Sequence, residues 1–252
     1  MSAHAYAIDG HDVLIYSRKR KSEMYGAQYL HAPIPGMTPG AAFTVNYELR
    51  GTALEYRAKV YGPDSRVAVS PESLLGAHDG WDIRGTYDEL WRTYGRYVQD
   101  IDLNPKVFSE LLDILRPDQV VCTVPRPLLC KEEAHTFAAQ RVWAIGDAPE
   151  RGIFCPVSVA KNTVVCNGEA VPGWYRAASI LDYSTAEWPH DHKPPISNVS
   201  EIDKPLWHNC TCWPDVLFLG RFGEWNKGVL SHEAFWKAQT NSAMTGVQGT
   251  LL

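Results

Sequence analysis

The sequence predicts an α/β fold in which a parallel sheet is interrupted by inserted segments that form a separate antiparallel layer. Three short apolar runs begin at Asp12, Gln119 and Val216, and each is followed by Pro, Gly or short polar residues. Because these runs lack the alternation of a half-exposed strand, they indicate strands buried in a parallel sheet. Antiparallel strand patterns cluster between the runs, which predicts a second layer for the intervening segments.

The N-terminal region is predicted to be a helix followed by a buried strand. Ser2–Ile8 has helical character, Gly10 ends that helix, and residues 12–16 read DVLIY. Residues 18–40 are rich in Gly and Pro, which predicts a loop. A helix that leads directly into a buried strand suggests that a further strand precedes it, so we expect the first strand of the sheet to lie before Met1.

The middle of the chain is predicted to contain a hairpin and two helices. Phe43–Arg50 and Ala53–Tyr61 have strand composition and meet at Gly51-Thr52, which predicts an antiparallel hairpin. Residues 87–98 and Pro105–Leu115 carry apolar residues at helical spacing. The next buried strand is predicted over residues 119–124.

The C-terminal half is predicted to consist of further strands, one exposed loop and a final helix. Strand patterns cover residues 142–145, 153–160, 163–166, 174–181 and 216–219. Residues 187–205 are polar and rich in Pro, which predicts an exposed loop. A helix is predicted over residues 230–241.

Composition and charge argue against nucleic acid and membranes as partners. The chain has 24 Lys and Arg against 29 Asp and Glu, a formal net charge of -5, and no long basic segment. It has no apolar stretch of membrane-spanning length. Its six cysteines are scattered and no secretory segment is recognisable, so we expect reduced cysteines and a cytoplasmic protein.

The segment MSAHAYAIDGHDVLIYSRK resembles the end of the first helix and the second strand of FAD enzymes of the glutathione-reductase and amine-oxidase type. In that family a G-x-G-x-x-G loop comes before this helix, and Met1 falls just after the place of that loop. The second strand of the family ends in an acidic residue that binds the adenosine ribose. Here Ser17 stands at that place, followed by Arg18, so the resemblance implies a weakened ribose contact.

Two later segments extend the resemblance. VVCTVPRPLLC resembles the strand that leads to the V-x-x-x-P element of amine-oxidase-like flavoproteins, with Pro125 at its end. LFLGRFGEWNKGVLSHEAF resembles their C-terminal flavin motif and the Gly-Arg segment of UDP-galactopyranose mutases. The resemblance implies that FAD contacts the following residues: Gly220, Arg221, Gly223, Val229 and Leu230.

The segment GAQYLHAPIPG resembles the loop under the isoalloxazine ring of these flavoproteins, which implies a flavin pocket at Gly26, Ala27, Gln28 and Leu30. The whole pattern is similar to flavoproteins encoded by actinobacterial phages. It implies a Rossmann-like parallel FAD-binding sheet, without its first strand, and an inserted antiparallel-sheet substrate domain. The FAD-binding domain is predicted over residues 1–40, 117–150 and 214–245, and the substrate domain over 41–116 and 151–213.

The resemblance implies an FAD-dependent oxidoreductase that transfers a hydride from a small-molecule substrate to flavin. Tyr175 and Arg176, with Trp188, are predicted to form the substrate wall. No catalytic residue is identified, and the substrate, the electron acceptor and the oligomeric state stay open. Two alternatives also stay open: a non-redox flavin-dependent mutase acting on a sugar nucleotide, and a flavin-free degenerate binding protein.

The soft ligands of the chain are not expected to hold a metal. His208, Cys210 and Cys212 are separated by single residues, whereas zinc knuckles usually place two to four residues between cysteines. Cys130 and His135 could form a nucleophilic pair, but their spacing defines no geometry. The sequence therefore predicts no metal site, with Cys210 and Cys212 in the pocket or the core.

Overall fold

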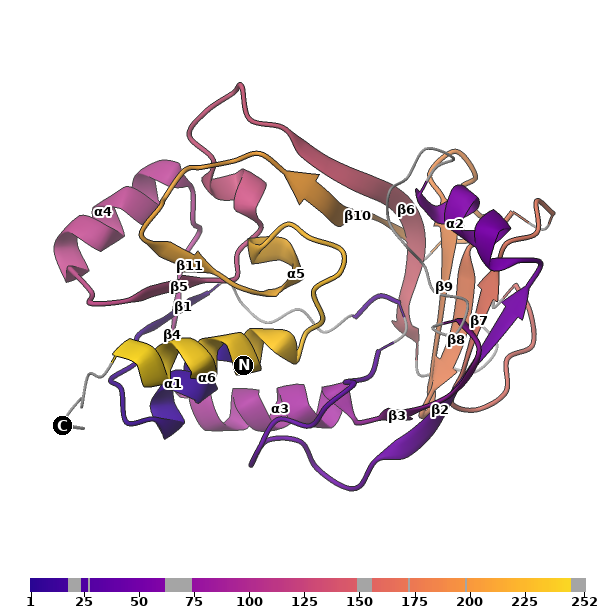
Figure 1. Cartoon of the computed structure of the whole chain (residues 1–252), viewed down its shortest axis with the longest axis horizontal. Helices are drawn as coiled ribbons and strands as arrows, with labels where there is room; N and C mark the ends of the chain where they lie inside the picture. The colour runs from indigo at the N-terminus through magenta and orange to yellow at the C-terminus, as the bar shows by residue number, and fades with distance from the viewer. Residues whose placement is uncertain are drawn as a thin grey trace.

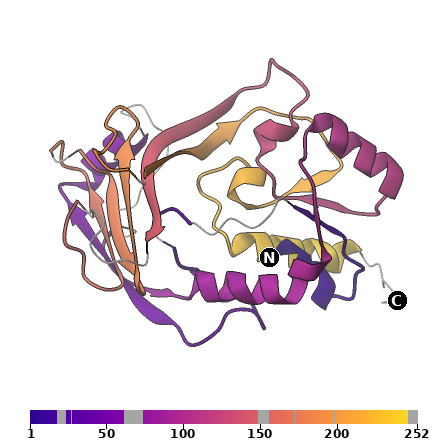
Figure 2. The ribbon, with the colours of Figure 1, turned by 180° about the vertical axis from the view of Figure 1, so that it is seen from behind.

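The structure is a computed structural model of the chain, and it describes residues 1–17, 24–26, 28–61, 74–148, 156–171, 173–197 and 199–245. Figure 1 shows two regions: a large sheet on one side, and short parallel strands surrounded by helices on the other. Figure 2 shows the same division from behind, with α3 (Ile83–Tyr94) along the lower edge. The described residues therefore form a mixed α/β structure, as the sequence predicts.

The large sheet has seven strands in the order β10-β6-β9-β8-β7-β2-β3. Neighbouring strands are antiparallel except β2 and β7, which pair in parallel from Asn46 with Thr163 to Arg50 with Asn167. The strands are β2 (Phe43–Arg50), β3 (Gly76–Gly80), β6 (Phe137–Ala148), β7 (Thr163–Asn167), β8 (Arg176–Ile180), β9 (Tyr183–Pro189) and β10 (Val199–His208).

The second region contains two parallel pairs of short strands. β1 (Ile15–Ser17) pairs with β4 (Val98–Asp100), and β5 (Val120–Cys122) pairs with β11 (Val216–Phe218). The helices α1 (Ser2–Ile8) and α6 (Glu233–Thr245) share an apolar cluster with Val13, Val121 and Leu217. On the other side, α4 (Pro105–Leu115) packs through Phe108 in a cluster with Cys122. Helices therefore cover both faces of the β5–β11 pair.

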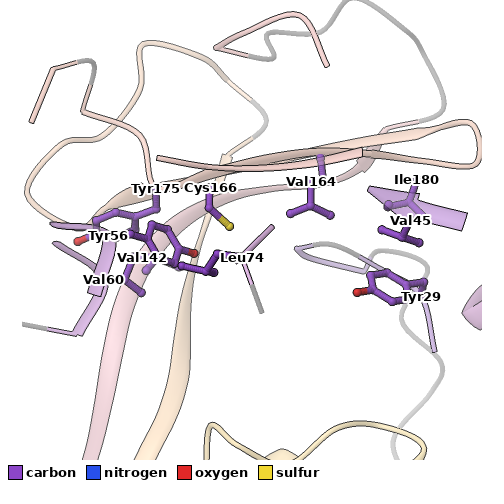
Figure 3. Packing of buried hydrophobic residues seen from close by; sticks show 11 residues of the cluster. Tyr29, Val45, Tyr56, Val60, Leu74, Val142, Val164, Cys166, Tyr175 and Ile180 are labelled. Carbon is purple, nitrogen blue, oxygen red and sulfur yellow. The ribbon is translucent and has the colours of Figure 1, made fainter. Parts of the chain in front are cut away.

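The large sheet is buried on both faces. Figure 3 shows one face, where Val142 and Val164 pack with Tyr56 and Val60 of α2 (Ala53–Tyr61). Val165, the next residue of β7, belongs to a second apolar cluster on the other face. Since successive side chains of a strand point to opposite faces, the sheet separates these two cores.

The ends of the predicted helices follow local capping signals. The side chain of Asp82 accepts hydrogen bonds from the backbone N–H groups of Arg84 and Gly85 at the start of α3. Asn104 caps α4 in the same way, and Pro105 occupies the first turn, where no backbone donor is needed. The predicted helix over Pro105–Leu115 is confirmed with its boundaries.

The predicted hairpin across Gly51 is wrong, because residues 53–61 form α2. Thr52 and Glu55 cap this helix reciprocally: Glu55 N–H donates to Thr52 Oγ1 at 3.2 Å, and Thr52 N–H donates to Glu55 Oε2 at 2.7 Å. Such a capping box starts a helix even when strand-forming residues follow. β2 pairs instead with β3 and β7.

The predicted exposed loop over residues 187–205 is wrong at both ends, and of its described residues only 190–197 lie outside the strands. Glu187 lies in β9, and Val199–His208 forms β10, which pairs with β6. Pro205 is tolerated because the strand register shifts between Pro205 and Trp207, where a missing backbone donor disturbs the ladder least.

The three apolar runs do not form one hydrogen-bonded sheet among the described residues. β5 and β11 lie side by side, whereas β1 pairs with β4 in a separate two-stranded sheet. β4, at residues 98–100, pairs with the N-terminal strand, and β6, at residues 137–148, pairs within the large sheet.

Within the described ranges, none of the helices combines the length and the apolar character needed to cross a bilayer.

Candidate functional site

A cluster of charged side chains lies on the α2-facing side of the large sheet. Arg176 of β8 stands directly opposite Glu187 of β9 in the register, and Lys204 comes from β10. Arg176 Nη2 donates to Glu187 Oε1 at 2.9 Å, and Lys204 Nζ donates to the second carboxylate oxygen, Oε2. Glu187 is 3 % exposed, so two cations share one buried carboxylate.

Two further cations reach this cluster from the segment that follows β11. Lys227 Nζ donates to Gln140 Oε1 at 2.9 Å and lies 3.5 Å from the centre of the Tyr61 ring. Arg221 Nε donates to the carbonyl oxygen of Val229 at 3.3 Å. Among the described residues, neither Lys227 nor Arg221 forms an ion pair with a carboxylate. We call these five charged residues the basic cluster: Arg176, Glu187, Lys204, Arg221 and Lys227.

The pKa values of the basic cluster reflect its excess of cations. Burial alone would raise the pKa of Glu187, but the charges of Arg176 and Lys204 outweigh burial and hold that pKa far below its ordinary value. Burial, followed by the charge of Lys204, lowers the pKa of Lys227 to about 6. Burial, followed by the charge of Arg176, lowers the pKa of Arg221. A bound anion would raise the pKa values of Lys227 and Arg221 again, because it favours their protonated forms.

Neutral donors complete the surroundings of the basic cluster. The hydroxyl groups of Tyr29 and Tyr47 lie 3.0 Å apart, and burial raises the pKa of both phenols, so they stay protonated. The buried Nε of Arg176 has no hydrogen-bond partner among the described residues. Guanidinium, ammonium and phenol groups together bind phosphate or carboxylate oxygens, so the arrangement suits an anionic ligand.

Gly26 and Gln28, predicted for the flavin pocket, lie beside the basic cluster. Gly26 has φ +84°, and a Cβ there would lie 2.9 Å from Glu187 Oε1. The carbonyl oxygen of Gly26 accepts a hydrogen bond from Thr185 Oγ1 at 2.9 Å. A cavity of about 10 Å³, enough for one water molecule, is lined in part by Gly26, Gln28 and Thr185.

The glycines after β11 have different roles. Gly220 has φ +74° and begins the short helix α5 (Gly220–Gly223), which carries Arg221. A Cβ at Gly223 would lie 2.6 Å from the carbonyl oxygen of Cys122, so Gly223 permits close packing of α5 against β5. Of the residues predicted from this motif to bind FAD, only Arg221 brings a side chain to the basic cluster.

The other residues predicted to bind the cofactor bring no side chain to the basic cluster. Leu30 is fully buried in the apolar core, and Ser17 is exposed at the end of β1. Pro125 precedes the short helix η3 (Arg126–Leu129), Val229 is buried, and the Leu230 N–H donates to Glu233 Oε2 at the start of α6. Two predicted residues lie outside those that the structure describes: Arg18 and Ala27.

The predicted substrate wall is divided between the two faces of the large sheet. Arg176 lies in the basic cluster, and Tyr175 packs in the neighbouring apolar cluster of Figure 3. Trp188 is 4 % exposed and packs with Trp174 on the opposite face. Because Trp188 follows Glu187 in the strand, its side chain points away from the basic cluster.

Lys204 and Lys227 were not predicted as site residues. Lys204 lies in the segment expected to be an exposed loop. Lysines are common in such loops and do not indicate a binding site. In β10 it is two positions after Ile202, which packs on the same face, so a strand assignment would have marked it as a buried cation. Lys227 lies in a turn, and nothing in its local pattern indicates burial.

A larger hollow, of about 530 Å³, lies on the other face of β6 and β10, with Arg141, Asp203 and Trp225 in its lining. Arg141 Nε lies 2.9 Å from Asp203 and 3.1 Å from Glu201. Since Arg141 is already paired with two carboxylates, the basic cluster is the stronger candidate for an anionic ligand.

Cys210 is buried and Cys212 is partly buried. The structure brings them together with Cys130 and His135, and the four ligand atoms lie within 4.8 Å of one another. The spacing argument considered one segment at a time, whereas this cluster combines two segments. We call these four residues the Cys/His cluster.

Comparison of the chain with protein-family models, curated proteins and solved structures finds no match.

Proposed function

We propose that the protein is an FAD-dependent oxidoreductase that holds an anionic small molecule at the basic cluster. The observation that carries the proposal is the ratio of four basic side chains to one carboxylate in a mostly buried position. Buried charges without a counter-ion are unfavourable, so such a cluster is best explained by an anion that binds there.

The donors fit the anionic parts of a dinucleotide or of its substrate. The terminal nitrogens of Arg221 make no hydrogen bond with the described residues, and Nε of Arg176 is also without a partner. Gly26 and Gln28 adjoin the same cluster, and helices cover both faces of the β5–β11 pair, as in a Rossmann-like sheet. These features support the family resemblance of the sequence.

Bound FAD would supply the group that accepts a hydride. The chain itself would bind and orient the substrate: Arg176 and Lys204 attract its anionic group, and Glu187 keeps both cations in place. The protonated phenol of Tyr47 can donate a hydrogen bond to the ligand. Arg221 and Lys227 would approach from the other region, so ligand binding would connect the two regions.

FAD binding to the purified full chain tests this proposal. We expect quenching of FAD fluorescence on binding and competition by inorganic pyrophosphate. Arg221→Met is expected to weaken binding at least about tenfold, since it removes a charge-assisted bidentate contact. Lys237→Met is the matched control, because Lys237 is exposed and pairs with Glu224 outside the cluster. No FAD binding by the wild-type chain, or equal binding by Arg221→Met, would contradict the proposal.

The same cluster also supports the flavin-dependent mutase, because several cations around one carboxylate suit a diphosphate better than a single carboxylate. Incubation of the FAD-loaded chain with a sugar nucleotide distinguishes the oxidoreductase from the mutase. Reduction of the flavin by substrate without an added reductant favours the oxidoreductase, whereas isomerisation that requires prior chemical reduction of the flavin favours the mutase. A chain that binds pyrophosphate but stays colourless after soaking with FAD is a flavin-free binding protein.

A further inference from the structure

The Cys/His cluster lies where β6 begins and β10 ends. Sγ of Cys130 is 3.7 Å from Sγ of Cys210 and 3.9 Å from Sγ of Cys212. Nδ1 of His135 is 3.3 Å from Sγ of Cys130 and 3.7 Å from Sγ of Cys212. Four soft ligand atoms therefore surround a common centre.

These separations match those around a tetrahedral zinc ion. With Zn–S of about 2.3 Å and Zn–N of about 2.0–2.1 Å, tetrahedral geometry places two sulfurs about 3.8 Å apart and a sulfur and a nitrogen about 3.6 Å apart. The observed distances agree within a few tenths of an ångström. A disulfide requires about 2.05 Å between sulfurs, and Cys130, Cys210 and Cys212 are free.

Hydrogen bonds between two loops hold these ligands in place. Thr136 N–H donates to Asn209 Oδ1 at 2.7 Å, and Asn209 N–H donates to the carbonyl oxygen of Thr136 at 3.3 Å. Trp213 Nε1 donates to the carbonyl oxygen of Leu129 at 2.7 Å. The two loops are thus tied on both sides of the cluster by bonds that do not involve the ligand atoms.

Groups outside the four ligands favour bound thiolates. The backbone N–H of Lys131 points to Sγ of Cys212 at 3.5 Å, and Arg126 Nη2 donates to the carbonyl oxygen of Cys210 at 3.3 Å. Three thiolates with one divalent ion carry a net negative charge, which the nearby Lys131 and Arg126 offset. Such outer contacts orient ligands and raise metal affinity.

We propose that Cys130, His135, Cys210 and Cys212 bind one zinc ion as a structural site. Four protein ligands fill a tetrahedral shell and leave no open position, which is the property of a structural rather than a catalytic zinc. Cys130 directly follows η3, which comes after β5, and Cys212 precedes β11. The ion therefore fastens the β5–β11 pair to the ends of β6 and β10 in the large sheet.

The test is the metal content of the full chain, purified under reducing conditions and dialysed against metal-free buffer. Elemental analysis should give about one zinc ion per chain. Replacement by Co²⁺ should give the visible ligand-field bands of a tetrahedral site and the thiolate charge-transfer bands. Cys212→Ser should weaken zinc binding more than about 100-fold, since even outer contacts account for 10–100-fold.

Cys122→Ala is the matched control, because Cys122, the last residue of β5, is buried in the core and lies outside the cluster. It should retain its zinc. A wild-type chain that neither contains zinc nor takes up Zn²⁺ or Co²⁺ when reduced would overturn the proposal, as would a Cys212→Ser variant with unchanged zinc affinity. Two missing thiols in a titration of the freshly purified, metal-free chain would indicate a disulfide instead, and would also overturn it.

Discussion

The basic cluster and the Cys/His cluster differ in their charge and in how the chain assembles them. The basic cluster uses long side chains from three strands and from the segment after β11, and its cations outnumber its carboxylate. The Cys/His cluster uses short side chains on two loops, and their ligand atoms converge before any ion is added. An anion site is thus recognised by unbalanced charge, and a metal site by converging ligand atoms.

The largest effect should come from Glu187→Gln, which removes the one carboxylate of the basic cluster. Breaking a buried ion pair while its cations stay buried should reduce the free energy of unfolding by about 3–5 kcal/mol, measured by urea denaturation. Zinc content should not change, because the Cys/His cluster does not depend on this carboxylate. Glu201→Gln is the control: Glu201 is exposed and pairs with Arg141 and His190 on the other face. Equal losses in the two variants would show that charge balance is unimportant in the basic cluster.

The free energy of unfolding should depend on pH because of the buried side chain of Lys227. Its pKa is about 6 in the folded protein and close to 10.5 when unfolded, so between these values the unfolded chain binds the extra proton. Stability should therefore rise with pH in this window, by up to about 1.4 kcal/mol per pH unit from this group.

Lys227→Met should remove this contribution and stabilise the chain most at the acidic end of the window. Urea denaturation of both proteins at several pH values measures the difference. Lys237→Met should keep the wild-type slope. Pyrophosphate should reduce the slope in the wild type only, because an anion favours protonated Lys227; a parallel pair of wild-type and Lys227→Met curves would contradict the burial of this lysine.

A smaller effect should distinguish, at Gly26, the steric clash of an added Cβ from the strain of its positive φ. Both Gly26 and Gly36 have positive φ, but a Cβ at Gly26 meets Glu187 and Arg176, whereas nothing lies within 4 Å of one at Gly36. Gly36→Ala should reduce stability by about 1–2 kcal/mol from backbone strain alone. Gly26→Ala should lose about 1 kcal/mol more and should also weaken pyrophosphate binding. Equal losses of stability in the two variants, with unchanged pyrophosphate binding, would show that Gly26 does not contribute to the basic cluster.

The sequence predicts the elements that have strong local signals. The helix over Pro105–Leu115 is found where its helical spacing places it, and the apolar runs over residues 119–124 and 216–219 contain β5 and β11. Residues 53–61 have strand composition but form α2, because the capping box of Thr52 and Glu55 starts a helix there. Pro205 and the polar residues of β10 are typical of a loop, so the sequence predicts a loop there. The strand forms because it pairs with β6.

The candidate sites depend on contacts between distant segments, which explains why the sequence reveals them only in part. Arg176 and Arg221 were singled out individually, but their proximity results from the packing of β8 against the segment after β11. Lys204 becomes a buried cation only when β10 joins the sheet. Cys130 and His135 become part of a candidate metal site only because the segment after β10 places Cys210 and Cys212 beside them.

The parallel pairing of β2 with β7 has a consequence for synthesis on the ribosome. β6 to β10 are consecutive in the chain and can form the rest of the sheet among themselves, but β2 and β3 are made much earlier. One edge of β2 can pair with β3 soon after synthesis, but the other edge must wait for β7, which is translated on the order of one hundred residues later. At about 5–20 residues per second, the edge of β2 that pairs with β7 stays open for on the order of ten seconds. Chaperone binding to the nascent chain should therefore concentrate on Phe43–Arg50 during that interval.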